Sequence, residues 1–507
     1  MKRKIIVFGF LLIALLLAVT PVLAQLEPQA PLSPIPVSAD WSFETNQATA
    51  TDHREMAVAA DCDVNGDGYK DLLVGKRDYD SNTHDNGKAW LFYGNVTGLN
   101  TSPTRTFDPP YTNSDGFFGT DVACADVNGD GVDDILIGMD NYESVYDDEG
   151  ALFVWYGATE GPTTNHNWMA RGNSTYAHLG FSIDNAGDVN GDGYEDIITG
   201  VNGNDYSGLT QAAYVWYGGS GGLGDNGLPS NAGWSASDTS HSIGFAYIVR
   251  GIGDVNGDGF DDVLISAHGY DSGITDQGAV LVYYGSASGP NLGVAGTVAN
   301  ADWMAVSGQA SARFAHFGVD GVGDLNGDGY DDLAVGAYYY DDPETNEGAV
   351  FVWYGGLGGL GQNGSPANAD WIAETNNAGD NMGYAVRPAG DVNGDGYADL
   401  LATAPGFDAP GSSGTLTDAG SWYVWYGGKN GLVGPRGSPA NANIIGYGDQ
   451  ASSQLGKDDG SVGDVNKDGL DDIFVLSLNY SNPEQSEGKV FGYYSRIKNI
   501  YLPMIRR

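Results

Sequence analysis

A nine-residue pattern, D-x-N-x-D-G-x-x-D, occurs seven times along this chain and constrains its fold more than any other feature. One copy is Asp324-Leu-Asn-Gly-Asp-Gly-Tyr-Asp-Asp332, and an aliphatic run follows it. The other copies begin at Asp63, Asp126, Asp188, Asp254, Asp391 and Asp464. Seven matched copies are not a chance event, so the chain is built from a repeated unit.

Each copy has the chemistry of a calcium loop. Asp324, Asn326 and Asp328 offer side-chain oxygens, Tyr330 a backbone carbonyl and Asp332 a closing carboxylate, while glycine stands at the sixth position, where the backbone must turn. Such an all-oxygen set suits Ca²⁺ and is poorly suited to zinc. The pattern therefore predicts up to seven bound calcium ions.

The charge balance of the chain is strongly acidic. Asp and Glu number 66 against 22 Lys and Arg, which gives a formal net charge of -44. Nucleic acids and anionic membrane surfaces are poor partners for such a body. Three carboxylates in each loop account for a good part of this acidity, but the remainder is still acidic.

The first residues have the features of an export signal. Lys2, Arg3 and Lys4 precede an apolar run from Ile5 to Val19, and small residues up to Ala24 offer a cleavage site. Residues 1–24 are therefore expected to be a signal peptide; an uncleaved N-terminal anchor is the alternative. No other stretch is apolar enough to span a bilayer. The protein is expected to be secreted or displayed at the cell surface.

The chain has only two cysteines, so it is not a disulfide scaffold. Cys62 stands one residue before its calcium loop and Cys124 two residues before the next one. Equivalent strand ends of neighbouring units can lie close together, which would allow a bond, whereas two buried thiols are the alternative. The one-residue offset points the side chains to opposite strand faces, which argues against a bond.

The repeat unit has the pattern of a four-stranded antiparallel sheet. Residues 25–38 are Pro-rich and form an expected extended spacer before it. In the fifth unit an Ala301-Asp-Trp303 strand, Phe317-Gly318, the calcium loop, Leu333–Gly336 and an aromatic strand, Val350–Gly355, follow one another. Short alternating runs bounded by Gly, Asn and Asp favour strands, and the loops recur every 62 to 73 residues. The prediction is an all-β, seven-bladed β-propeller over residues 39–495, with the aromatic strands packed between blades.

The two ends of this body suggest how the ring closes. It begins with a lone Trp strand, Ala39-Asp-Trp41, and ends with an aromatic strand, Val490-Phe-Gly-Tyr-Tyr494, with no later Trp strand. The simplest topology therefore uses the strand around Trp41 as the outer strand of the last blade. Residues 496–507 form a C-terminal tail that is apolar and basic.

These residues resemble the FG-GAP repeats of the integrin alpha-chain β-propeller and its bacterial relatives, over nearly the whole mature chain. Phe118-Gly119 and Phe317-Gly318 keep the phenylalanine, whereas Leu179-Gly180 and Met382-Gly383 replace it. In that family the loop joins the first two strands of a blade and binds calcium on the lower face, while partners commonly dock on the opposite face.

The resemblance implies metal ligands at the first, third, fifth, seventh and ninth loop positions. They are Asp63, Asn65, Asp67, Tyr69, Asp71, Asp126, Asn128, Asp130, Val132, Asp134, Asp188, Asn190, Asp192, Tyr194, Asp196, Asp254, Asn256, Asp258, Phe260, Asp262, Asp324, Asn326, Asp328, Tyr330, Asp332, Asp391, Asn393, Asp395, Tyr397, Asp399, Asp464, Asn466, Asp468, Leu470 and Asp472. The seventh loop departs from the pattern, because Lys467 places a positive charge between Asn466 and Asp468. It is expected to be the weakest site.

Three classes of function fit these features. A rigid propeller whose calcium is structural is suited to display a binding surface for an extracellular protein or glycan, as in adhesion proteins. A lectin with pockets between blades is the second class, and a calcium-dependent polysaccharide-degrading enzyme is the third. The histidines are scattered and no catalytic constellation is visible, so a binding scaffold without enzymatic activity is the first expectation. The body is expected to be monomeric and to bind no nucleic acid.

Overall fold

The computed structural model describes residues 37–47, 56–80, 85–110, 115–201, 211–238, 242–412 and 414–496. The chain divides into two units, Met1–Ser33 and Pro34–Arg507, of which the second holds all the described residues. The expected signal peptide, almost all of the expected spacer and the tail beyond residue 496 lie outside the described residues.

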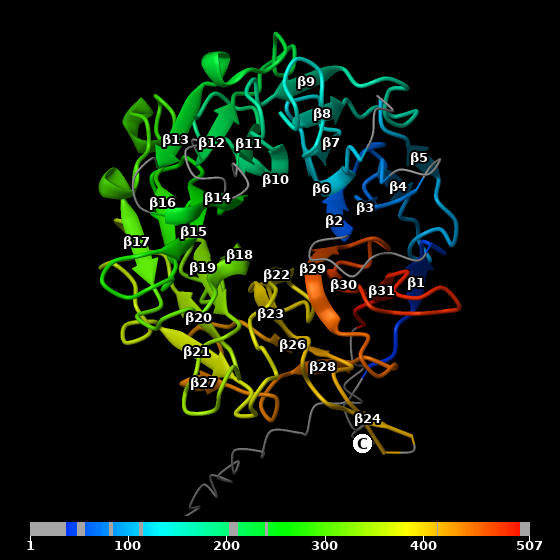
Figure 1. Ribbon diagram of the computed structural model, residues 1–507, viewed down its shortest axis with the longest axis vertical. Helices are drawn as coiled ribbons and strands as arrows, with labels where there is room; N and C mark the ends of the chain where they lie inside the picture. Colours follow the sequence, from blue (N-terminus) through cyan, green and yellow to red (C-terminus); the bar gives the residue numbers. More distant parts are fainter. Residues whose placement is uncertain are drawn as a thin grey trace, which may run out of the picture. The chain divides into compact units, whose positions relative to one another are not determined.

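Seven four-stranded antiparallel sheets succeed one another around a central channel, which confirms the predicted seven-bladed β-propeller (Figure 1). Blades 1 to 3 are formed by β2 (Met56–Cys62), β3 (Asp71–Lys76), β4 (Lys88–Phe92) and β5 (Arg105–Phe107); β6 (Phe118–Ala125), β7 (Asp134–Met139), β8 (Ala151–Trp155) and β9 (Trp168–Arg171); and β10 (Leu179–Gly187), β11 (Asp196–Val201), β12 (Gln211–Trp216) and β13 (Trp234–Asp238). Blades 4 and 5 are formed by β14 (Ser242–Gly251), β15 (Val263–Tyr270), β16 (Ala279–Tyr283) and β17 (Trp303–Val306); and β18 (Phe314–Gly323), β19 (Asp332–Ala337), β20 (Ala349–Trp353) and β21 (Trp371–Glu374). Blades 6 and 7 are formed by β22 (Val386–Gly390), β23 (Asp399–Ala404), β26 (Ser421–Trp425) and β28 (Ile444–Tyr447); and β29 (Leu455–Gly463), β30 (Asp472–Ser477), β31 (Lys489–Tyr493) and β1 (Trp41–Glu44).

A few short elements decorate the blades. β27 (Arg436–Gly437) adds to β21 in parallel, and the hairpin of β24 (Ala409–Gly411) and β25 (Gly414–Leu416) projects from blade 6. Three short 3-10 helices, η2 (Pro229–Asn231), η3 (Pro290–Gly293) and η4 (Val298–Asn300), lie in the connections of blades 3 and 4.

The core lies between neighbouring blades, because each sheet buries both of its faces. All residues of β19 and β20 are buried, so apart from Asp332 at the start of β19 these strands are continuously apolar in sequence instead of alternating. The Trp at the start of an outermost strand packs against an aromatic residue of the third strand of the next blade, as Trp303 does with Trp353 at a centroid distance of 5.5 Å and Trp234 with Tyr283 at 5.2 Å. The aromatic strands thus pack between blades, as the sequence predicts.

The ring closes through the N-terminal strand. β1 pairs antiparallel with β31, with Trp41 opposite Gly492. The Trp41 ring is buried and contacts Phe92 of blade 1 and Phe474 of blade 7, at centroid distances of 5.1 and 6.2 Å. The N-terminal strand is therefore the outer strand of the last blade. The Trp41 side chain also packs in the interface between blade 7 and blade 1, which is called the seam below.

The argument against a disulfide is wrong, because Cys62 and Cys124 are bonded, with their Cα atoms 5.6 Å apart. The register of β2 against β3 shifts between Ala59 and Cys62, so β2 carries an extra residue just before the cysteine. In β6 the shift lies before Val122, and pairing is regular from there through Cys124. Cys62 lies opposite the ninth loop residue, Asp71, whereas Cys124 lies opposite Ile135, so the offset remains and the two thiols occupy opposite faces of their sheets. Because neighbouring blades pack face to face, opposite faces are what bring Cys62 and Cys124 together in the core between blades 1 and 2.

Candidate functional site

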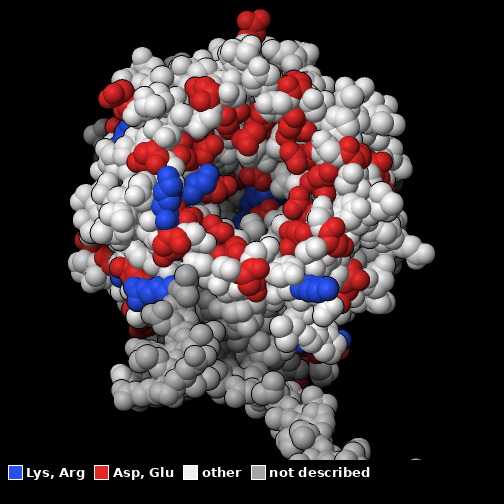
Figure 2. All heavy atoms as spheres, turned by 180° about the vertical axis from the view of Figure 1, so that it is seen from behind, with Lys and Arg blue, Asp and Glu red and all other residues white. Residues whose placement is uncertain are grey.

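The seven candidate calcium loops occupy equivalent places in the ring. Each one joins the innermost strand of a blade to the second strand, as the loop between β18 and β19 does. Because the innermost strands are equivalent, the loops all lie at the same end of the blades. Acidic side chains gather around the mouth of the central channel on the face shown in Figure 2.

The first aspartate of each loop organises the turn. Asp324 Oδ1 accepts hydrogen bonds from the backbone N–H groups of Gly327 and Asp328, at 2.6 and 3.1 Å, and its Oδ2 accepts from Gly329 at 2.8 Å. Gly329 has a φ of +91°, and a Cβ placed there would meet no atom within 4 Å. The glycine is therefore required for its backbone conformation and not for space.

The ninth residue fastens the loop to the blade. Asp332 is fully buried, its Oδ2 accepts from the N–H of Leu325 and its Oδ1 from that of Gly355, both at 2.8 Å. Gly355 follows the third strand, so one carboxylate joins three segments of the blade. The Oδ1 contact recurs in the other six blades, from the N–H groups of Gly94, Gly157, Gly218, Gly285, Gly427 and Ser495.

These buried carboxylates have strongly raised pKa values. The pKa of Asp332 is raised to about 8, chiefly by burial and also by the charges of Asp324 and Asp328, while the two backbone hydrogen bonds act in the opposite direction. The pKa of the ninth residue is about 8 in five other loops and about 7 for Asp399, with burial as the first cause in every case. Ionisation of these carboxyls is therefore unfavourable in the folded protein, and a nearby cation would favour it.

The donor chemistry of the loops fits a hard cation, because every candidate ligand supplies oxygen. As the loops stand, their carboxylates turn toward backbone N–H groups, and among the described residues no three His, Cys, Asp or Glu side chains form a group that could hold a metal ion. The five candidate ligands of each loop lie within nine residues of chain, and calcium binding by all thirty-five stays a prediction.

Sequence reasoning missed a row of contacts that links neighbouring loops. The eighth residue of a loop accepts a hydrogen bond from the backbone N–H of the first residue of the preceding loop, as Asp133 Oδ2 does from Asp63 at 2.6 Å. The others are Glu195 from Asp126, Asp261 from Asp188, Asp331 from Asp254 and Asp471 from Asp391, at 2.7 to 3.0 Å. An acidic eighth residue in five of seven loops is the signal that would have found them.

Lys467 does not lie between the ligands of its own loop. Its ammonium group reaches the first loop, where Nζ donates to the carbonyl oxygen of Asp67 at 3.2 Å and stands 5.4 Å from the Tyr69 ring centre. Lys70, which holds the eighth position of the first loop, has no carboxylate to link these two loops. Lys467 therefore supplies a contact across the seam where the acidic link is missing.

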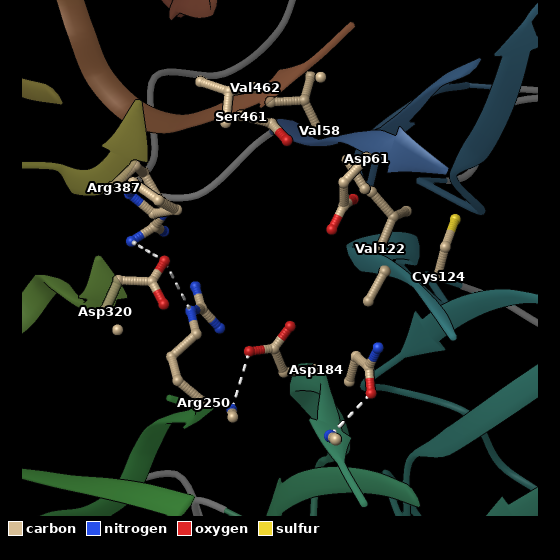
Figure 3. Close-up of a pocket in the computed structure, with 18 of the residues that line it drawn as sticks. Val58, Asp61, Val122, Cys124, Asp184, Arg250, Asp320, Arg387, Ser461 and Val462 are labelled. Carbon is tan, nitrogen blue, oxygen red and sulfur yellow. Dashed lines mark hydrogen bonds and ion pairs between the residues drawn. The ribbon is translucent and has the colours of Figure 1, made fainter. Parts of the chain in front are cut away.

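The central channel contains a cavity of about 520 Å³ lined by the innermost strands. Four consecutive blades place charged residues there at one register, four residues before the loop: Asp184, Arg250, Asp320 and Arg387 (Figure 3). Asp320 Oδ2 lies 3.9 Å from Arg250 Nε and 3.6 Å from Arg387 Nη1. Burial raises the pKa of Asp184 well above its ordinary value, although the charge of Arg250 lowers it.

The described histidines make structural contacts. His178 is buried, with Nδ1 3.1 Å from the carbonyl oxygen of Asp140. His316 Nδ1 lies 2.7 Å from the Tyr338 hydroxyl, and its ring lies 4.4 Å from that of His268. Burial and the charge of Arg313 lower the pKa of His268 to about 3, so this imidazole is neutral at ordinary pH.

At the other end of the blades, the connections expose several aromatic side chains. Tyr146 lies between β7 and β8, Tyr176 between β9 and β10, and Tyr339 just after β19, and they are 39%, 40% and 41% exposed. The backbone N–H of Tyr176 donates to the carbonyl oxygen of Asp147 at 2.8 Å, so the first two connections touch.

Among the described residues no helix is long and apolar enough to cross a bilayer.

Comparison with known proteins agrees with this geometry. A family model described as FG-GAP repeat matches residues 251–283, 320–353 and 382–425, and one described as FG-GAP-like repeat matches residues 63–137. Integrin alpha-5 of Xenopus laevis is 29% identical over 207 residues, which cover 39% of this chain and 19% of that protein. Integrin alpha-V of Gallus gallus is 29% identical over 242 residues, or 46% of this chain and 20% of the relative. Phosphatidylinositol-glycan-specific phospholipase D of Bos taurus is 34% identical over 148 residues, or 27% of this chain and 17% of the enzyme. The matched region spans about a fifth of the length of these relatives.

Proposed function

Because this chain is a seven-bladed, integrin-alpha-like propeller of FG-GAP repeats, we propose that it is a secreted or cell-surface scaffold that binds an extracellular protein or glycan. The observation that supports a binding role is the set of exposed tyrosines at the end of the blades opposite the nine-residue loops. One end is fixed by seven loops that hydrogen-bond to their own blades, and mostly to one another. The other end has connections that vary in length and expose Tyr146, Tyr176 and Tyr339.

Calcium in this proposal is structural. The loops would hold it through their first, third and fifth side chains, the seventh carbonyl and the ninth carboxylate, and the ion would compensate the buried negative charge of residues such as Asp332. At free calcium of roughly ten to a hundred times the dissociation constant, each filled site adds about 1.4 to 2.7 kcal/mol to the stability. Seven such sites would rival the net stability of a typical domain.

The proposal is tested by thermal unfolding of the full chain in millimolar calcium and in EGTA. We expect a large fall in melting temperature with the chelator. An unchanged melting curve would remove calcium from the account.

The binding role is tested by affinity capture from extracellular material and by a glycan array, with wild type and Tyr176→Ala. Tyr176 is 40% exposed, so we expect the variant to keep its melting temperature and to lose captured partner. Equal capture by both proteins would place the binding surface elsewhere. Binding of a glycan without any product would favour a lectin, and depolymerisation of the glycan would favour an enzyme.

A further inference from the structure

Two connections on the face opposite the calcium loops share an acidic pattern. In blade 5, Glu344 and Glu347 lie in Pro343-Glu-Thr-Asn-Glu-Gly348, between β19 and β20. In blade 7, Glu484 and Glu487 lie in Pro483-Glu-Gln-Ser-Glu-Gly488, between β30 and β31. Neither pair belongs to the nine-residue loops.

The second glutamate of each pair is buried with unsatisfied oxygens. Glu347 and Glu487 have 0% exposure. Glu347 Oε1 accepts a hydrogen bond from the backbone N–H of Asp342 at 2.8 Å, but its Oε2 makes no close hydrogen bond to a described residue. Neither oxygen of Glu487 makes a close hydrogen bond there, although the backbone N–H of Asn482 and the carboxyl of Glu484 interact with it. One buried oxygen of Glu344 and one of Glu484 are also without a partner. Leaving charged oxygens buried and unpaired is costly, so a ligand that satisfies them would be strongly favoured.

The cations near the pairs are bound to other carboxylates. The buried Lys76 lies beside the blade 7 pair, with Nζ 3.4 Å from the carbonyl oxygen of Glu487 and 3.2 Å from Asp78 Oδ1. In blade 5, Arg436 Nη1 lies 2.6 Å from Glu374 Oε2. In blade 7, Lys489 Nζ lies 2.8 Å from Glu44 Oε1. Glu374 and Glu44 occupy the same register, opposite the first residue of the third strand. Among the described residues, none of the four glutamates of the two pairs forms an ion pair.

Blade 2 shows what a resident cation does at this place. Glu149 precedes Gly150 as Glu347 precedes Gly348, and Arg171 occupies the register of Glu374 and Glu44. Arg171 Nη1 lies 3.9 Å from Glu149 Oε1, which also accepts hydrogen bonds from Ser144 Oγ and from the N–H of Val145. Blades 5 and 7 carry glutamate where blade 2 carries this arginine, so they have more negative charge and less compensation.

We propose that the Glu344–Glu347 and Glu484–Glu487 pairs each bind a divalent cation, with Ca²⁺ the best match to their oxygen donors. Since no three acidic side chains form a metal-holding group in the described residues, each site has two carboxylates, and backbone carbonyls and water complete the shell. Two carboxylates are few for calcium, so we expect affinities in the 10⁻⁴ to 10⁻³ M range of extracellular modules.

The pKa values of the buried glutamates are raised, which is expected where carboxylates lie close together without a compensating cation. Burial raises the pKa of Glu487, and the charges of Glu44 and Glu484 raise it further, while the backbone N–H of Asn482 offsets part of the effect. Burial and the charge of Glu344 also raise the pKa of Glu347, while the backbone N–H groups of Asp342, Glu344 and Asn376 act in the opposite direction. A proton shared by the two carboxylates would also remove the repulsion between them. An experiment must therefore distinguish a bound proton from a bound metal ion.

The experiment is equilibrium dialysis of the full chain against radioactive calcium at about 5 mM, above the expected affinity range. We compare wild type with Glu347→Gln/Glu487→Gln, and use Glu149→Gln as the matched control, because that buried glutamate has its own arginine. We expect the double variant to bind two fewer ions per chain and the control to bind the same number as wild type. The difference does not depend on whether the nine-residue loops are filled, so the calcium proposal for the loops can fail separately.

Glu344→Gln/Glu484→Gln, at two partly exposed positions, provides a second variant if the buried one does not fold, and the same loss of two ions is expected. Anomalous diffraction from calcium-grown crystals of wild type should show a peak between the carboxylates of each pair. Equal calcium counts in wild type and in a folded double variant, or no peak at either pair, would overturn the proposal and indicate that each pair shares a proton.

Discussion

At the scale of single residues, the eighth position of each loop decides how neighbouring blades are joined. Where it is acidic, as at Asp133, its side chain accepts the N–H of the preceding loop. Ala398 occupies this position in the sixth loop and offers no such acceptor, so only its own N–H, which donates to the carbonyl oxygen of Asp324 at 3.1 Å, connects the two loops. The ring is therefore unevenly joined, and its weaker junctions can be tested.

Asp133→Ala should destabilise the protein by about 1 to 2 kcal/mol, since it leaves the N–H of Asp63 without its acceptor. Asp133→Asn keeps an acceptor oxygen and should cost less. Chemical denaturation at fixed calcium measures both. An equal loss of unfolding free energy in the two variants would show that the charge of Asp133, and not its hydrogen bond, stabilises the protein.

Ala398→Asp should have the opposite effect, because it supplies the missing acceptor for the N–H of Asp324. We expect a gain of about 0.5 to 1.5 kcal/mol, the usual net value of one hydrogen bond. The same denaturation assay measures it. A loss of stability would mean that adding another carboxylate to this acidic face outweighs the new bond.

At the scale of elements, the closing strand and the disulfide both join parts of the ring that the repeat itself does not connect. β1 supplies the outer strand of blade 7, and Cys62–Cys124 ties the innermost strands of blades 1 and 2 together. β1 lies at the seam between blades 7 and 1, and the disulfide lies at the next interface, between blades 1 and 2. The first blade is thus held on one side by Trp41 and on the other by a covalent bond.

Trp41→Ala should cost about 3 to 5 kcal/mol, the usual range for removing a buried aromatic side chain. The ring is 7% exposed and touches both blades at the seam. Ser42→Ala, at the exposed neighbouring position, should change the stability by less than about 0.5 kcal/mol. Urea unfolding compares them, and a similar small change in both would contradict closure by β1.

Cys62→Ala/Cys124→Ala should destabilise the oxidised protein by about 2 to 4 kcal/mol, because the bond closes a long stretch of chain with a sequence separation of 62. Calorimetry with and without a reductant measures this. The reductant should lower the melting temperature of wild type and leave that of the variant unchanged. Insensitivity of wild type to the reductant would argue that the thiols are free.

At the scale of the whole molecule, the buried carboxylates of the seven loops make the stability of the ring depend on both pH and cations. In metal-free protein the ninth residues, such as Asp332, keep a proton up to about pH 8, whereas an unfolded aspartate loses it near its ordinary pKa of 3.8. Their contribution is therefore fully present at low pH and is lost as pH rises through the folded pKa.

In EGTA, the melting temperature should fall as pH rises from 6.5 to about 8.5, a window chosen above the range where neutral His268 acts in the other direction. In saturating calcium this fall should shrink, because the ion takes the place of the protons. Differential scanning fluorimetry across both series measures it. Asp332→Asn should reduce the slope in EGTA, and a flat metal-free profile would contradict the raised pKa values.

Much of this molecule is predictable from local patterns in the sequence. Each repeat contains the sequence patterns of all its strands. These patterns predict the strand order, the seven blades and the use of the Trp41 strand in the last blade. The grouping of candidate ligands follows as well, because each set lies within nine residues.

What the sequence does not reveal depends on contacts between units. The prediction for the cysteine pair was wrong because it treated the two strands as if they lay in one sheet. The strands belong to blades that pack face to face, so side chains on opposite faces of the two sheets meet between them. The role of Lys467 required the knowledge that the last loop is a neighbour of the first. The channel residues, such as Arg250 and Asp320, stand out only when equivalent positions of separate blades are placed side by side.

The pairing of β1 with β31 has a consequence for how copies of this chain can exchange parts. The two strands lie at opposite ends of the described chain, and until they meet, β31 has an unpaired edge. A β1 strand from a second copy fits that edge as well as its own does, and carries the same tryptophan. Closure within one chain is therefore favoured only because its own β1 is at a higher effective concentration than that of another copy. Refolding at high protein concentration should yield strand-swapped dimers, whereas refolding at low concentration should yield monomers.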